Sequence, residues 1–176
     1  MNRYIIVDKI CSGLFSDVYK GVDQVSKEQV AIKRVFACTE LEFSNIKTEF
    51  NRMCKVNCQN VVKYIDLIVQ SKYCDIIMEY ISGWTLKQVF QQRSKDGVSN
   101  SPETTQSLSS FPFDLSQAQI DYIGSQIANT VIYLHDIGII HRDLHYENIL
   151  VTPELLIKII DFSDSIYKKD CMKLTE

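Results

Sequence analysis

The residues best suited to chemistry in this sequence lie between positions 139 and 163. Two carboxylates and an amide, Asp143, Asn148 and Asp161, are spaced five and thirteen residues apart. Apolar residues on both sides of the polar loop predict two short strands that hold it in place. Carboxylate and amide oxygens suit a hard cation such as Mg²⁺, and a carboxylate can also orient an attacking hydroxyl. The pattern predicts a site that handles a metal-bound phosphate.

A single Asp or Asn is often just a turn residue, so the ordered set carries the argument. The string His141-Arg142-Asp143-Leu144, with Asn148 and then Asp161-Phe162 after it, resembles the catalytic loop and metal-binding motif of eukaryotic-type protein kinases, in particular the Ser/Thr kinases. The resemblance implies ATP and Mg²⁺ as cofactors. It also implies that Asp143 is the catalytic base and that Asn148 and Asp161 are metal ligands.

A second motif occupies residues 30–35. Its Val-Ala-Ile-Lys string matches the third strand of the kinases, and alternation along a strand places Ala31 and Lys33 on the same face. By resemblance, Lys33 reaches the nucleotide phosphates and Ala31 leaves room for adenine. Apolar residues at three- and four-residue steps predict a helix over 41–55. Glu49 in this helix is the expected ion-pair partner of Lys33, and a solvated glutamate is the alternative.

The glycine-rich nucleotide loop of the kinases is matched only in part. Strands predicted at 4–10 and 18–22 enclose a loop in which Gly13 is the middle glycine, while Cys11 and Ser16 replace the other two. Glycines there let backbone N–H groups approach phosphates, so side chains at two positions predict a stiffer loop. A plain β-hairpin turn is the alternative. The resemblance implies nucleotide contacts from Ile10, Cys11, Ser12, Gly13 and Val18.

Strands predicted at 61–69 and 75–79 lead to a segment that resembles the kinase hinge. Met78 takes the gatekeeper position, which is compatible with a role as core filler, and the backbone of Glu79 and Ile81 is expected to contact adenine. The resemblance further implies an adenine pocket formed by Val18, Ala31 and Leu150. It also implies a stack of four side chains called the regulatory spine: Met53, Tyr64, His141 and Phe162.

The expected fold is α+β and protein-kinase-like, with an antiparallel N-lobe sheet and C-helix at 1–81 and a partial, mainly helical C-lobe at 82–176. A long amphipathic helix is predicted at 116–135, with Ser116 as its N-cap and Gly138 just past its end. The C-lobe is also expected to contain a short helix at 86–92, a Ser/Thr-rich insert at 93–112, the catalytic loop at 139–151 and the metal motif at 161–163.

Three features depart from the kinase pattern. His145 stands where Ser/Thr kinases carry a Lys near the γ-phosphate, and a histidine should stabilise transition-state charge less. Ser163 replaces the Gly after Asp161-Phe162, which should restrict the backbone flip of that motif. The sequence stops 15 residues after Asp161. We therefore expect about two thirds of a kinase domain of on the order of 250 residues, truncated after this motif and with an exposed apolar C-lobe surface.

Composition and charge favour a soluble globular protein. A net charge of −3 indicates neither a nucleic-acid nor a membrane partner, no apolar run reaches the ~18 residues of a membrane span, and the expected location is cytoplasmic. The six cysteines include no Cys-x-x-Cys pair, which predicts reduced thiols. Cys54 and Cys58, one helical turn apart, would need two further ligands to hold a metal.

Competing functions remain open at this stage. The leading prediction is ATP- and Mg²⁺-dependent phosphoryl transfer to Ser or Thr hydroxyls of a protein substrate, with a catalytic set of Asp143, Lys33, Glu49 and His145. The alternative is a truncated pseudokinase that binds nucleotide or a partner kinase and regulates it. A small-molecule phosphotransferase ranks last, since such enzymes generally lack both full strings. Self-association through the exposed C-lobe surface is also expected.

Overall fold

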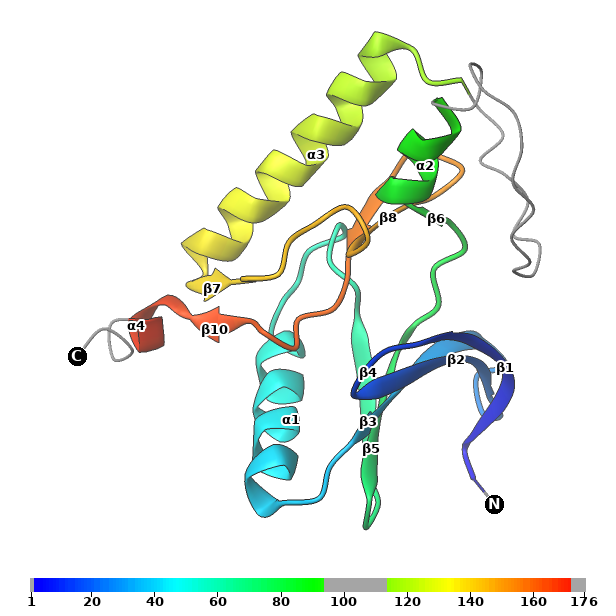
Figure 1. Ribbon diagram of the computed structural model, residues 1–176, viewed down its shortest axis with the longest axis vertical. Coiled ribbons are helices and arrows are strands. Elements are labelled where there is room, and N and C mark those ends of the chain that lie inside the picture. The colour runs from blue at the N-terminus through cyan, green and yellow to red at the C-terminus, as the bar shows by residue number, and fades with distance from the viewer. Residues whose placement is uncertain (1, 94–113, 172–176) are drawn as a thin grey trace. The chain divides into compact units, whose positions relative to one another are not determined.

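A computed structural model describes residues 2–93 and 114–171 of the chain (Figure 1). The chain divides into two compact units, Met1–Ile81 and Ser82–Glu176. The predicted α+β class is confirmed, because an antiparallel sheet with one helix forms the first unit and short strands with further helices form the second. The predicted insert at 93–112 lies outside the described residues, except for its first position.

The first unit is built on five antiparallel strands in the order β1-β2-β3-β5-β4. In chain order these are β1 (Tyr4–Ser12), β2 (Ser16–Asp23), β3 (Gln29–Phe36), β4 (Tyr64–Val69) and β5 (Tyr73–Glu79). Runs rich in β-branched and aromatic residues account for them. β4 begins later than the strand predicted at 61–69, because the N–H of Val61 donates to the carbonyl of Cys58 and closes a turn.

The helix α1 (Glu40–Met53) follows β3. Thr39 caps its first turn, since its hydroxyl accepts the N–H of Glu42 and the Glu42 carboxylate accepts the N–H of Thr39. The helix ends two residues before the predicted end at 55. One side of it is buried, which confirms the predicted amphipathic pattern and includes Ile46, Glu49, Arg52 and Met53.

Strand register places four predicted nucleotide-site residues on one face of this sheet. Val18 lies opposite Lys33 on the neighbouring strand, and Ala31 lies opposite Met78. Residues directly opposite each other share a face, and alternation puts Ala31 and Lys33 on the same face of β3. All four side chains therefore point to one side. The other side carries a core cluster of Tyr4, Val30, Ile32 and Ile77.

The second unit combines helices with short strands. Its described elements are β6 (Trp84–Thr85), α2 (Leu86–Arg93), α3 (Gln117–Asp136), β7 (Ile139–Ile140), β8 (Ile149–Val151), β9 (Ile157–Ile159), β10 (Ile166–Tyr167) and α4 (Lys168–Cys171). Strands β6, β8 and β9 form one sheet, and β7 pairs with β10. The predicted catalytic loop runs between β7 and β8 (Figure 1).

The helix α3 has both of its predicted ends. Ser116 and Gln119 form a reciprocal capping box at its N-terminus. Gly138 follows the helix with a φ of 78°, a left-handed conformation that glycine adopts without steric cost. Ile123 and Leu134 from the predicted apolar stripe are buried. Across residues 2–93 and 114–171, the structure contains no helix with both the length and the apolar character needed to cross a membrane.

Candidate functional site

The catalytic loop brings Asp143 and Asn148 into direct contact. The Asn148 side-chain amide donates to the Asp143 carboxylate oxygen Oδ2 at 3.0 Å and to the Asp143 backbone carbonyl at 2.9 Å. Asn148 is buried, whereas the Asp143 side chain is 48% exposed. The buried Asn148 amide thus orients one carboxylate oxygen of Asp143 through a hydrogen bond. The carboxylate itself remains accessible from solvent.

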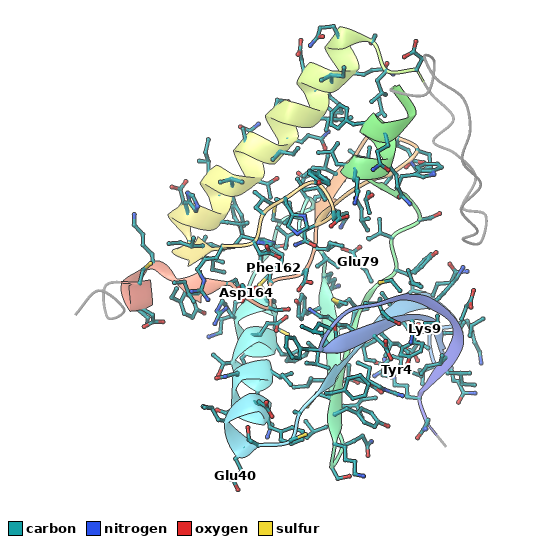
Figure 2. The ribbon with its side chains drawn as sticks, viewed as in Figure 1. Tyr4, Lys9, Glu40, Glu79, Phe162 and Asp164 are labelled. Atoms are coloured by element: carbon teal, nitrogen blue, oxygen red, sulfur yellow. The ribbon has the colours of Figure 1, made fainter. Side chains whose placement is uncertain are left out.

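His141 links this loop to the segment that carries Asp161. Its Nδ1 accepts the N–H of Asp143 at 3.3 Å, which leaves Nε2 as the protonated nitrogen that donates to the carbonyl of Ile160 at 3.0 Å. The imidazole also packs against Phe162, with ring centroids 4.5 Å apart. Phe162, which follows β9 in the chain and is labelled in Figure 2, is fully buried. Two members of the predicted regulatory spine are therefore in contact within this unit.

The two predicted metal ligands are connected through the backbone. The N–H of Ile160, the residue before Asp161, donates to the carbonyl of Asn148 at 2.9 Å. Asn148 offers an amide oxygen and Asp161 offers carboxylate oxygens. These ligands fit Mg²⁺ if water and phosphate oxygens complete its coordination. Among the described residues, no group of three or more His, Cys, Asp or Glu side chains could hold a metal ion. Cys54 and Cys58 accordingly gain no further ligand of these types.

His145 lies beside the predicted base. Its Nε2 is 3.5 Å from the Asp143 carboxylate and 3.1 Å from the Asn148 side-chain nitrogen, and its Nδ1 accepts the N–H of Glu147 at 3.2 Å. The imidazole thus belongs to the same polar cluster as the base and the amide. Its predicted role in catalysis stays a prediction.

Lys87 in the first turn of α2 contacts the predicted catalytic loop at Tyr146 and Glu147. Its backbone N–H donates to the carbonyl of Tyr146 at 3.1 Å, and its ammonium donates to the Glu147 carboxylate. This ion pair lowers the pKa of Glu147 and raises the pKa of Lys87. The ammonium also lies 5.7 Å from the centre of the Tyr146 ring. Sequence reasoning did not identify Lys87.

In the first unit, both members of the predicted phosphate clamp are buried. Lys33 is 5% exposed and Glu49 is 7% exposed. The Glu49 carboxylate accepts a hydrogen bond from the Tyr64 hydroxyl at 2.8 Å, which ties α1 to β4. Buried charges need partners, so both positions are consistent with a clamp. The ion pair between Lys33 and Glu49 stays a prediction.

The predicted nucleotide loop is a tight hairpin. Ile10, Cys11 and Ser12 end β1 and are exposed, and the N–H of Gly13 donates to the carbonyl of Ser16 at 2.7 Å. Next to the turn, Asp17 pairs with Lys9 at 2.9 Å, a contact that lowers the pKa of Asp17 (Figure 2 labels Lys9). The structure thus shows the plain hairpin turn that the sequence gave as the alternative, and the stiffness of the loop and its nucleotide contacts stay predictions.

The adenine contacts expected from the backbone of Glu79 and Ile81 stay predictions, and the structure shows which Glu79 group is already engaged. The N–H of Glu79 donates to the carbonyl of Lys63 at 3.0 Å, and the Glu79 carboxylate accepts the N–H of Lys63 at 2.9 Å. This pairing between Lys63, just before β4, and the end of β5 engages the Glu79 N–H, so that donor is not available to adenine. A contribution from Glu79 would have to come from its carbonyl. Ile81 ends the first unit, and Leu150 lies in β8 of the second.

Gln126 was also missed from the sequence. Its side-chain amide donates to the carbonyl of Leu155 at 2.8 Å and accepts the N–H of Ile157 at 3.2 Å. It thereby ties α3 to the hairpin between β8 and β9, which lies between the two predicted metal ligands. The available signal was a glutamine at helical spacing from Ile123 and Thr130, inside the buried stripe of α3.

The chain matches the family model of the protein kinase domain over residues 4–173. It is similar to MAP3K epsilon protein kinase 1 of Arabidopsis thaliana, with 30% identity over 163 residues, 92% of this chain. It is also similar to the cytokinesis protein sepH of Aspergillus terreus, 28% identical over 92% of this chain, and to the serine/threonine-protein kinase pakA of Dictyostelium discoideum, 26% identical over 90%. The chain therefore belongs to the protein kinase family, which confirms the resemblance found in its motifs.

The match covers a small part of each relative. The chain spans 11% of the Arabidopsis protein, 11% of the Aspergillus protein and 12% of the Dictyostelium protein. Family membership and fold follow from the match, whereas activity, substrates and partners are matters for proposal.

Proposed function

We propose that this chain carries out ATP- and Mg²⁺-dependent phosphoryl transfer to Ser or Thr hydroxyls of a protein substrate. The observation that supports this best is the hydrogen bond from the Asn148 amide to the Asp143 carboxylate. It joins the expected base and an expected metal ligand in one loop. His141 and Ile160 connect that loop to Asp161, the second expected ligand.

Each polar group has a role that its surroundings suit. The exposed Asp143 carboxylate would accept the proton of the acceptor hydroxyl, and the Asn148 amide would keep that carboxylate oriented. Asn148 and Asp161 would hold Mg²⁺ through oxygen atoms, and the ion would neutralise charge on the phosphates. The buried Lys33 would bind phosphate oxygens with Glu49 as its partner. His145 would add a hydrogen-bond donor beside the base.

The proposal also includes the kind of acceptor and the cellular compartment. The name of the Dictyostelium relative, serine/threonine-protein kinase pakA, supports a protein as the phosphate acceptor. None of the six cysteines forms a disulfide in the described part of the chain, and this favours a reducing compartment such as the cytoplasm.

A pseudokinase that binds nucleotide or a partner kinase is the second candidate. The observation in its favour is the nucleotide hairpin, in which side chains occupy two of the three glycine positions. Such a hairpin offers phosphates a more obstructed backbone than a glycine loop. This candidate predicts nucleotide binding without phosphate transfer. A phosphotransfer assay therefore distinguishes the two candidates, whereas a nucleotide-binding assay does not.

The first test is thermal unfolding of the 176-residue chain with and without Mg²⁺-ATP. Ligand at about a hundred times its dissociation constant adds about 2.7 kcal/mol of stability, which corresponds to a rise of about 5–11 °C for a chain of this size. Asp161→Asn is a matched control, because Asn tolerates the same backbone conformation but lacks the charge. A Mg²⁺-dependent rise that the variant loses supports the proposal. An unchanged transition, or a rise independent of Mg²⁺, contradicts it.

A further inference from the structure

Asp161 has an unusual backbone conformation. Its φ is 59°, in the left-handed region that residues with a Cβ seldom adopt. Asp can occupy this region when its short side chain makes local hydrogen bonds. A residue in this conformation at a predicted metal site needs a structural explanation.

Ser163 supplies the local hydrogen bonds. Its hydroxyl donates to the Asp161 carboxylate oxygen Oδ1 at 2.5 Å, and its backbone N–H approaches the same oxygen at 3.4 Å. Both donors converge on Oδ1, so these contacts fix the orientation of the carboxylate relative to the backbone. A glycine at this position would keep the N–H and lose the hydroxyl.

The following residues are held by similar contacts. The Ser165 hydroxyl and backbone N–H both donate to the carbonyl of Phe162, at 2.6 Å and 3.0 Å. The guanidinium of Arg142 donates to the carbonyl of Asp164, which Figure 2 labels. The Ser163 hydroxyl therefore completes a set of side-chain donors that fixes residues 161–165, and it is the member that contacts the carboxylate.

We propose that Ser163 is a positioning residue that holds the Asp161 carboxylate for metal binding. It donates to Oδ1 and so fixes how the carboxylate is turned relative to the backbone when a metal ion binds. This rests on the proposed function, because Asp161 must be a ligand of nucleotide-bound Mg²⁺. In this chain the serine thus does more than restrict the motif. It prepares the ligand before the metal arrives, which lowers the cost of ordering on binding.

The test compares wild type with Ser163→Ala and Ser163→Thr, with Ser125→Ala as a control. Ser125 is an exposed serine whose hydroxyl donates to a backbone carbonyl of its own helix. Thermal unfolding at saturating ATP is followed as Mg²⁺ is raised, and the midpoint of the Mg²⁺-dependent rise is recorded. Backbone ¹⁵N relaxation of residues 161–165 without nucleotide or metal gives a readout independent of binding.

Ser163→Ala should raise the Mg²⁺ midpoint about fivefold, the factor for one hydrogen bond of typical net strength, and should increase backbone motion at 161–163. Ser163→Thr, which keeps the hydroxyl, should restore both values, and Ser125→Ala should change neither. If wild type responds to Mg²⁺-ATP and Ser163→Ala has the same or a lower midpoint, the inference is wrong and the proposed function stands. If wild type shows no Mg²⁺-dependent response, both are wrong.

Discussion

Gln126 offers a direct test of how the fold holds the predicted metal ligands. Its amide makes two hydrogen bonds, to Leu155 and Ile157, that tie α3 to the β8–β9 hairpin. Gln126→Ala removes both. At about 1 kcal/mol each the loss is about 2 kcal/mol, which corresponds to about 4–8 °C in melting temperature. Since the hairpin joins Asn148 to Asp161, the variant should also need more Mg²⁺ for nucleotide binding.

Urea unfolding of the 176-residue chain measures the loss of stability, and the Mg²⁺ midpoint at saturating ATP measures the effect on the site. Gln117→Ala is the matched control, because Gln117 lies on the same helix and its exposed amide donates to Asp121 one turn along. The control should lose less than about 0.5 kcal/mol. A loss in Gln126→Ala no larger than in Gln117→Ala would refute the reasoning.

Four other substitutions test separate parts of the structure. A Cβ at Gly124 in α3 would meet no atom within 4 Å, so Gly124→Ala should raise the free energy of unfolding in urea by about 0.5–1 kcal/mol. A Cβ at Gly83 would lie 2.5 Å from a backbone oxygen, so Gly83→Ala should lower that free energy by about 1–3 kcal/mol. Changes of the same sign in the two variants would contradict this. The Arg3 guanidinium lowers the pKa of Asp23 from 3.8 to about 2, so the stability that this pair adds is complete above about pH 4 and is lost as pH falls toward 2. Arg3→Gln should move the NMR titration of Asp23 back toward 3.8, and an unchanged titration would disprove the assignment. His145→Lys should raise phosphotransfer turnover by placing a full positive charge beside the base, and the absence of any gain would count against a role for this position.

Sequence reasoning located the elements whose signals are local. Ser116 and Gly138 lie within a few residues of the helix ends that they define, and the capping box and left-handed glycine are both present. The alternation of Ala31 and Lys33 follows from strand geometry alone. The start of β4 was misplaced, because Val61 has strand propensity but takes part in a turn.

The contacts that hold the candidate site were beyond sequence reasoning, since they join residues far apart in the chain. Lys87 and Glu147 are 60 positions apart, and Gln126 reaches residues 29 and 31 positions away. The strand pairing that engages the Glu79 N–H was likewise invisible, because it depends on how β4 and β5 align. For Ser163 the sequence predicted only a restricted backbone flip, because the hydrogen bond of its hydroxyl to Asp161 depends on the local fold.

The central claim, that this chain transfers phosphate from ATP, is tested most directly by incubating it with γ-labelled ATP, Mg²⁺ and Ser- or Thr-containing protein acceptors. Asp143→Asn is the decisive variant, because the amide is isosteric but cannot accept the hydroxyl proton. We predict Mg²⁺-dependent label on Ser or Thr with wild type and none above background with the variant. Label that persists in Asp143→Asn, or no transfer from a wild-type chain shown to bind Mg²⁺-ATP, would contradict the claim.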